Sequence, residues 1–239
     1  MFKIIYQSKD YLVINKPAGL QVHPDAKNKG HTLTDLLLKD FPSIKDVGES
    51  SERPGIVHRL DKDTSGVMLV VLNKAAFYHF KKQFQRRKIK KTYWALVHGL
   101  PKKSRDVISL PIGRSLKNTR LRTASPYSRD KKLAQTAYQV LKTYSFSLSP
   151  KKQIPYALLQ VFPRTGRTHQ IRVHLKSIGH PICGDPVYKF KRLVPPPGLN
   201  RLFLISKKIE FNDLQGKKQA KEIKLDKELK QVLEKLKND

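Results

Sequence analysis

The stretch His58-Arg-Leu-Asp-Lys-Asp-Thr-Ser-Gly66 runs directly into the apolar segment Val67-Met-Leu-Val-Val-Leu72. A short continuous apolar run that follows turn-forming residues is typical of a buried β-strand. The residues ahead of it place a histidine, an arginine and two acids at the entrance of that strand. Charged loops at the edge of a sheet are common positions for catalytic groups. The alternative is a solvated loop with local ion pairs and no catalytic role.

Helical and strand-like patterns surround this segment without a regular alternation. Asn73 is expected to cap a helix, and Thr32, with Asp35 three residues on, is expected to cap an earlier one. Further strands are expected at 2–6, 11–15, 92–97, 136–141, 156–162, 202–205 and 209–211, further helices after Thr168 or His169 and after Asp226, and loops at 41–57 and 103–133. Because strict βαβ alternation is absent, we predict an α+β fold with a mixed, mainly antiparallel central sheet flanked by helices and loops.

Composition limits the class of protein. The chain has 239 residues, of which 38% are hydrophobic, and this is enough for a sizeable core and argues against a disordered basic tail. Its longest apolar run is far shorter than the roughly 18 residues that a membrane span needs, and its start resembles no signal peptide. The single cysteine, Cys183, excludes an intrachain disulfide and is expected to be a packed core side chain. We expect one cytoplasmic domain over residues 1–239.

Charge is the strongest compositional signal. Lysine and arginine number 49 against 19 acidic residues, so the formal net charge is +30. So basic a surface favours a nucleic-acid partner; an anionic membrane surface and an evenly spread lysine content are the alternatives. Arg114, Lys117, Arg120 and Arg122 are candidates to follow a phosphate backbone, as is the basic stretch 81–91.

A second chemical motif is Thr165-Gly-Arg-Thr-His-Gln-Ile-Arg-Val-His174. Gly166 allows a tight turn, and Arg167 and Arg172 are suited to bind phosphate or to hold a carboxylate through two hydrogen bonds. The motif lacks the Gly-x-x-x-x-Gly-Lys pattern of a nucleotide P-loop. Its two histidines lie about 140° apart around a helix, so they do not share a face as a zinc pair would.

Four motifs occur together in one order. They are Asn15-Lys-Pro-Ala-Gly-Leu20 with Val22-His-Pro24, then Val57-His-Arg-Leu-Asp-Lys-Asp-Thr-Ser-Gly-Val67, then Lys91-Thr-Tyr93, and last Arg164-Thr-Gly-Arg-Thr-His-Gln-Ile-Arg-Val-His174 followed by Gly179-His-Pro181 and Gly184-Asp-Pro-Val-Tyr188. This series resembles the motifs of the RluA-type family of RNA pseudouridine synthases. The resemblance covers residues 5–211 and implies the pseudouridine synthase fold, with an active-site cleft across the sheet and a C-terminal helix at about 226–237.

Two features depart from the family pattern. Family members often carry an N-terminal S4 RNA-binding domain, whereas the motifs begin here almost at Met1, so we expect a stand-alone catalytic domain. The family often has Leu-His-Ala in its last core strand, where this chain has Leu204-Ile-Ser206. The wall formed by Ile205 and Ser206 is therefore expected to differ in shape.

The resemblance also implies an activity and its residues. Pseudouridine formation breaks the N1–C1′ bond of an RNA uridine and rejoins the base through C5, so the nucleotide must be flipped out of its stack. By resemblance, Asp61 is the essential carboxylate, Arg172 pairs with it, and Tyr93 stacks on the uracil and is a candidate to help remove the C5 proton. A close arginine favours the ionised carboxylate. Three roles stay open for Asp61: attack on C1′, attack on C6, or removal of the 2′ proton to give a glycal.

The remaining expectations concern partners. Arg59 is expected to fill the space that the flipped base leaves, and Arg167, Lys90 and Lys91 are expected to bind neighbouring phosphates. The RNA is expected to be rRNA or tRNA, and an isomerisation needs no cofactor or metal. We expect a monomer without an obligatory protein partner and without a membrane. The alternative is a non-catalytic RNA-binding or ribosome-assembly factor on the same fold, although binding alone does not require the Asp61 carboxylate beside phosphates.

Overall fold

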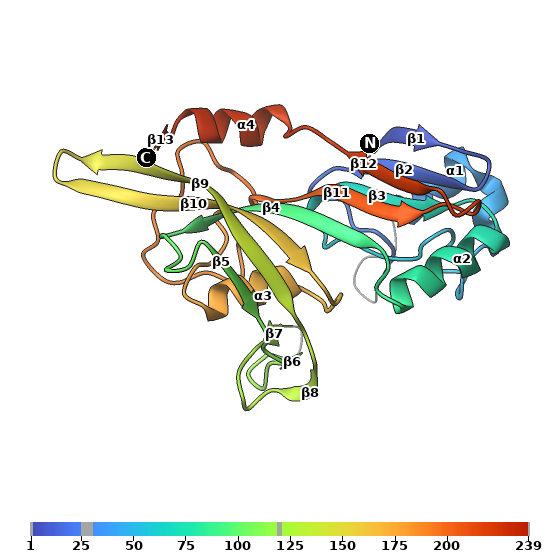
Figure 1. The fold of residues 1–239 in the computed structure, drawn as a ribbon, viewed down its shortest axis with the longest axis horizontal. Coiled ribbons are helices and arrows are strands. Elements are labelled where there is room, and N and C mark those ends of the chain that lie inside the picture. The colour runs from blue at the N-terminus through green and yellow to red at the C-terminus, as the bar shows by residue number, and fades with distance from the viewer. Residues whose placement is uncertain (1, 25–30, 119–120, 239) are drawn as a thin grey trace. The chain divides into compact units, whose positions relative to one another are not determined.

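The computed structural model describes residues 2–24, 31–118 and 121–238 (Figure 1). The chain divides into two compact units, the first formed by residues 1–91 and 205–224 and the second by residues 92–204 and 225–239. The expected single domain over 1–239 stays a prediction.

Five strands of the main sheet belong to the first unit. They are β1 (Lys3–Gln7), β2 (Tyr11–Lys16), β3 (Ser65–Val71), β11 (Leu204–Asn212) and β12 (Lys218–Glu222). Neighbouring strands are antiparallel except for β3 and β11, which run parallel. Every residue of β3 is buried, as its apolar run predicts. The strand that follows the Asp61 loop therefore anchors this loop in the centre of the unit.

The helices of the first unit begin at the predicted caps. They are α1 (Leu33–Asp40), the 3₁₀ helix η1 (Pro42–Asp46) and α2 (Lys74–Gln85). The Asp35 carboxylate accepts the backbone N–H and the hydroxyl of Thr32, at 2.8 and 2.7 Å. Asn73 Oδ1 accepts the N–H of Ala76 at 2.9 Å, which satisfies a donor that the helix itself leaves free. η1 interrupts the stretch 41–57, which the sequence analysis assigned to a loop.

The second unit contains a long antiparallel hairpin. Its main strands and helices are β4 (Lys90–His98), β5 (Arg105–Ile108), β9 (Thr136–Ser149), β10 (Lys152–Pro163), β13 (Lys237–Asn238), α3 (Gln170–Ser177) and α4 (Lys227–Glu234). β10 pairs with β4 and β9, while β5 and β13 add to β9. The hairpin is longer than the predicted strands 136–141 and 156–162, because pairing continues to Ser149 and Lys152 (Figure 1). Towards the tip, β9 alternates the apolar residues Tyr144, Phe146 and Leu148 with serines, a strand pattern that the predicted bounds left out.

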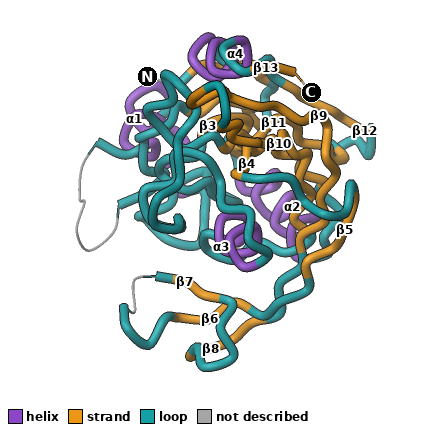
Figure 2. The backbone as a smooth tube through the Cα atoms, turned by 90° about the vertical axis from the view of Figure 1, so that its left-hand side faces the viewer, coloured by secondary structure: helices purple, strands orange, loops and turns teal. Residues whose placement is uncertain are grey.

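A small second sheet fills part of the region expected to hold loops and hairpins. Its strands are β6 (Ile112–Arg114), β7 (Arg122–Thr123) and β8 (Arg129–Lys132), with β6 in the middle. Ile112, Ala134, Val173 and Tyr188 form a buried cluster that ties this sheet to α3, and Figure 2 shows the two side by side. A Cβ at Gly113 would lie 2.3 Å from the Arg129 carbonyl oxygen, so only glycine fits between β6 and β8.

The α+β class with a mixed, mainly antiparallel sheet is confirmed by these pairings. The segments 202–205 and 209–211, for which a hairpin and a bent strand are both open from the sequence, are joined in one continuous strand, β11, that begins at Leu204. The last helix ends at Glu234 and not at about residue 237, because residues 237–238 pair with β9. None of the helices in the described part of the chain is both long and apolar enough to cross a membrane.

Candidate active site

Asp61 lies half-buried in the loop that leads into β3. Its carbonyl oxygen accepts the N–H of Thr64 at 3.1 Å, which closes a turn just ahead of the strand. The next carbonyl, that of Lys62, accepts the N–H of Gly19 at 2.9 Å. The motif around residues 15–20 is therefore hydrogen-bonded to the residue beside the expected catalytic carboxylate.

Lys16 strengthens this link. Its side chain is fully buried, and Nζ donates to the carbonyl oxygens of Pro17, Leu20 and Lys62 at 2.9, 2.7 and 3.0 Å. A buried ammonium is costly unless its donors are satisfied, and here they hold two loops together. This role of Lys16 was not predicted from the sequence. The signal for this role was a lysine at the end of an apolar strand, directly before a proline turn.

His58 anchors the start of the same loop. Its Nε2 accepts the backbone N–H of Leu69, inside β3, at 2.9 Å, and its ring stacks on Phe84 with centroids 4.7 Å apart. Burial, together with a smaller effect of the Lys91 ammonium, lowers the pKa of His58 to about 3. The imidazole is therefore neutral at neutral pH, which its acceptor role requires. This histidine has a structural role in the loop rather than that of an acid.

The other end of the loop depends on a close approach of two backbones. Gly66 has a φ of +120°, and a Cβ there would lie 2.3 Å from the Ser206 carbonyl oxygen. Ser206 is buried and its hydroxyl donates to the Val67 carbonyl at 2.9 Å. The residues that replace the family's His-Ala, Ile205 and Ser206, thus pair with the first residues of β3.

Arg59 projects from the loop with an exposed side chain. Its Nη1 lies 2.5 Å from Nε2 of His23, a buried residue of the opening motif. Since a guanidinium only donates, this Nε2 accepts, and the proton of the ring is on Nδ1, which donates to the Pro24 carbonyl at 2.9 Å. Arg59 is therefore oriented by the first motif.

The strand β4 carries three expected site residues. Tyr93 is buried and lies opposite Val161 of β10, while Trp94, on the other face of the strand, is half-buried. Lys90 is exposed, and Lys91 is half-buried, with a pKa that burial lowers from its ordinary value. The strand alternation predicted from the sequence thus separates the two rings.

Arg172 lies on α3 and is 3% exposed. Its Nε and Nη2 donate to the two carboxylate oxygens of Asp185 at 2.7 and 2.8 Å, and its guanidinium lies 5.0 Å from the Tyr188 ring centroid. Burial by itself raises the pKa of Asp185, but hydrogen bonds from Arg172 and from two backbone N–H groups outweigh it, so the net shift is downward. Asp185, within the Gly-Asp-Pro motif, was not predicted as a partner of Arg172.

The expected catalytic residues are divided between the two units. Asp61 belongs to the first unit, and Tyr93 and Arg172 belong to the second. The ion pair between Asp61 and Arg172 stays a prediction, as does the stacking role of Tyr93.

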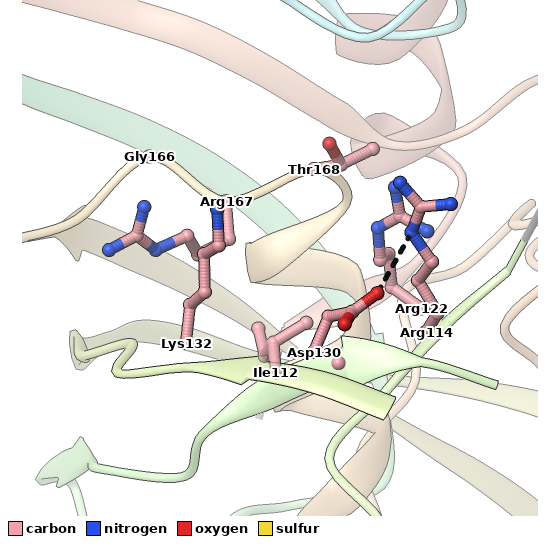
Figure 3. A pocket seen from close by; sticks show the side chains of 9 residues that line it. Ile112, Arg114, Arg122, Asp130, Lys132, Gly166, Arg167 and Thr168 are labelled. Carbon is pink, nitrogen blue, oxygen red and sulfur yellow. Dashed lines mark ion pairs between the residues drawn. The ribbon is translucent and has the colours of Figure 1, made fainter. Parts of the chain in front are cut away.

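Arg167 precedes α3 and is exposed. Its backbone N–H donates to Gln170 Oε1 at 3.0 Å, and its Nε donates to the Leu133 carbonyl at 3.2 Å. It lines a pocket of about 420 Å³ in the second unit (Figure 3). The lining residues are Ile112, Gly113, Arg114, Arg122, Asp130, Lys132, Gly166, Arg167 and Thr168. Of the other expected phosphate-binding residues, Lys117 is exposed and Arg120 lies outside the described residues.

Comparison with known proteins identifies the family. The family model described as RNA pseudouridylate synthase matches residues 10–177. The human protein RNA pseudouridylate synthase domain containing 1 has the same fold with a TM-score of 0.76 at 27% identity, covering 100% of this chain and 89% of that one. This chain belongs to the RNA pseudouridylate synthase family, as its motifs predicted.

Two curated relatives are similar over most of this chain. An uncharacterized RNA pseudouridine synthase of Aquifex aeolicus is 43% identical over 196 residues, which are 82% of this chain and 58% of the relative. Ribosomal large subunit pseudouridine synthase D of Nitrosomonas europaea is 42% identical over 186 residues, which are 78% of this chain and 49% of the relative. The chain thus spans about half the length of the curated relatives it matches.

Proposed function

We propose that this protein is an RNA pseudouridine synthase, an isomerase that converts specific uridines of structured RNA to pseudouridine. The observation that carries the proposal is Asp61, a carboxylate within the motif that resembles the family's catalytic motif, in a chain that belongs to this family. Relatives named for the ribosomal large subunit favour rRNA over tRNA as the substrate. We propose further that the protein acts in the cytoplasm as a monomer.

The reaction changes bonds without a net oxidation or reduction. The N1–C1′ bond breaks, the base turns, a C5–C1′ bond forms, the proton on C5 is lost and N1 gains a proton. Asp61 acts as an anion close to the ribose, either on C1′, on C6 or on the 2′ proton. Arg172 keeps this carboxylate ionised, and Tyr93 stacks on the uracil.

The contacts around Asp61 and Arg172 support these roles, because the loop that carries Asp61 and the side chain of Arg172 are each held by neighbours within their own unit. Lys16 binds the Lys62 carbonyl next to Asp61 at 3.0 Å, and Asp185 fixes the guanidinium of Arg172 through two hydrogen bonds. Groups that are held before the substrate binds lose little freedom in the reaction, which is how a protein lowers a barrier by positioning.

RNA binding is assigned to cations of both units. Arg59 fills the space of the flipped base, and Arg167, Lys90 and Lys91 bind neighbouring phosphates. The net charge of +30 attracts RNA over long distances. A non-catalytic RNA-binding or ribosome-assembly factor would need the same cations, but it would not need the carboxylate of Asp61.

The test uses unmodified rRNA and tRNA made by transcription. Each RNA is incubated with the purified protein, digested to nucleosides and separated by chromatography, which resolves pseudouridine from uridine. The wild-type protein is expected to form pseudouridine in at least one of the two RNAs, and Asp61→Asn to form none while still binding that RNA. If the wild-type protein converts no uridine in either RNA, the non-catalytic alternative replaces the proposal.

A further inference from the structure

The pocket of the second unit gathers cations from four separate segments. Arg114 ends β6, Arg122 begins β7, Lys132 ends β8 and Arg167 lies in the turn before α3. In Figure 3, Arg114 and Arg122 lie on one side of Asp130, and Lys132 and Arg167 lie on the other. The pocket has a volume of about 420 Å³ and contains a single carboxylate against four cationic side chains. It therefore keeps an excess of positive charge and attracts an anion.

Asp130 is a weak internal partner for these cations. Its Oδ2 lies 3.6 Å from Arg114 Nε, and both side chains are more than half exposed, at 70% and 56%. An exposed ion pair at this distance contributes little to stability. The backbone φ of Asp130 is +51°, a value that L-residues rarely adopt. The register between β6 and β8 is irregular next to this residue. Such a bulge redirects a side chain, here into the pocket that Figure 3 shows.

The chemistry of the lining selects phosphate. A guanidinium presents parallel N–H donors that match two phosphate oxygens, and three of the four cations are arginines. The volume of about 420 Å³ exceeds what one phosphate group needs, so a longer ligand can enter with its neighbouring atoms.

Exposed apolar side chains close in sequence to the residues that line the pocket favour RNA over free phosphate as its ligand. Tyr127 lies in the loop that joins β7 to β8 and is 80% exposed. Leu133 directly follows Lys132, and its side chain is 77% exposed. Unpaired bases stack on aromatic side chains while cations bind the backbone between them, which is how proteins hold single-stranded RNA.

We propose that this pocket is a subsite for a phosphodiester group of a single-stranded RNA segment. Arg114, Arg122, Lys132 and Arg167 bind the phosphate, and Tyr127 stacks on a neighbouring base. Asp130 competes with the phosphate for Arg114 and so keeps the affinity of the subsite low. This subsite rests on the proposed function in one respect, namely that the substrate is RNA.

The first experiment measures binding of a fluorescein-labelled 12-nucleotide oligouridylate to the full chain by fluorescence anisotropy. The double variant Arg114→Gln/Lys132→Gln is compared with Lys151→Gln/Lys152→Gln, which removes equal charge at the exposed tip of the β9–β10 hairpin. The first is expected to weaken binding roughly tenfold and to reduce the slope of log K against log salt by about 1.4, since each phosphate contact on a single strand contributes about 0.7. The control is expected to change affinity less than threefold. Equal losses in both double variants would overturn the subsite.

Two further variants test the roles of Asp130 and Tyr127. Asp130→Asn is expected to tighten oligouridylate binding about fivefold, and Asp106→Asn, which removes an exposed carboxylate paired with Lys103, less than twofold. Tyr127→Ala is expected to weaken oligouridylate binding about tenfold with an unchanged salt slope, and to leave binding of inorganic polyphosphate unchanged. If Asp130→Asn and Asp106→Asn change oligouridylate affinity equally, the proposed competition between Asp130 and the phosphate is refuted. If Tyr127→Ala binds oligouridylate as tightly as the wild type, the pocket is a general polyanion site and not a subsite for RNA.

These binding measurements use no catalytic step, so their failure is separable from failure of the proposed function. Thermal unfolding of each variant confirms that its fold is intact. If the wild-type protein forms pseudouridine but the two charge-matched double variants lose the same oligouridylate affinity, the subsite proposal fails and the proposed function stands.

Discussion

Replacing the buried Lys16 by methionine is expected to destabilise the first unit and to slow catalysis. Methionine has nearly the same length and volume but cannot donate a hydrogen bond. The variant leaves the carbonyl oxygens of Pro17, Leu20 and Lys62 without the donor that binds each of them at 3.0 Å or less. The 16–20 turn and the Asp61 loop then keep the hydrogen bond from the Gly19 N–H to the Lys62 carbonyl but lose the side-chain donor that they share.

The magnitude follows from those three bonds. A hydrogen bond from a charged group contributes about 1.5–3 kcal/mol net, and buried groups that lose their partner cost about 1–3 kcal/mol each. Methionine recovers part of this because it avoids burying an ammonium. We expect a net loss of about 3 kcal/mol in the free energy of unfolding. For a chain of this size, that loss lowers Tm by about 6–12 °C.

The assay is urea unfolding together with turnover on the RNA substrate. Lys9→Met, at an exposed position between β1 and β2, is the control for the loss of one lysine and is expected to cost less than about 0.5 kcal/mol. Lys16→Met is expected to lower kcat much more than it raises KM, because the Asp61 loop is held less firmly while the RNA-binding cations remain. A cost equal to that of Lys9→Met, with normal kcat, would refute the reasoning.

Three further predictions concern the buried pair of Arg172 and Asp185, the buried histidines, and the positive net charge. Asp185→Asn removes the carboxylate that binds the buried Arg172 and is expected to cost about 3 kcal/mol in urea unfolding, against less than about 0.5 kcal/mol for the exposed Asp106→Asn; equal costs would contradict the buried pair. Burial lowers the pKa of His58 to about 3 and that of His98 to about 4, so below pH 6.5 the unfolded chain binds more protons, and stability is lost as the pH falls toward those values. Between pH 7 and 5 the His58 contribution alone amounts to about 2 kcal/mol, and equal free energies of unfolding at the two pH values would exclude it. RNA affinity is expected to fall steeply with salt, with a log–log slope steeper than about −3, whereas a flat plot would mean that the positive charge lies away from the RNA.

Local patterns predicted the elements whose signals are short-range. Asn73 and Asp226 cap helices because their side chains reach a backbone N–H three residues on. The apolar run at 67–72 became the buried strand β3 because its two faces are both covered. Cys183 is buried as expected, and burial raises the pKa of its thiol.

Long-range partners could not be predicted in the same way. Lys16 binds Lys62, and Arg172 binds Asp185, across separations that no helical or strand period encodes. The pocket beside β6–β8 is assembled from four segments, and short polar strands give no periodic signal. The family motifs located the residues, but only the tertiary structure shows which neighbours orient them.

The most direct measurement follows the hydrogen that leaves the base. RNA transcribed with [5-³H]uridine releases tritium to water only when C5 forms its bond to C1′, so a single-turnover release assay reports the isomerisation itself. The wild-type protein is expected to release tritium, and Asp61→Asn to release none while binding the RNA with an affinity within about threefold of the wild-type value. Tritium release at the wild-type rate from Asp61→Asn would contradict the assignment of this carboxylate to the chemistry.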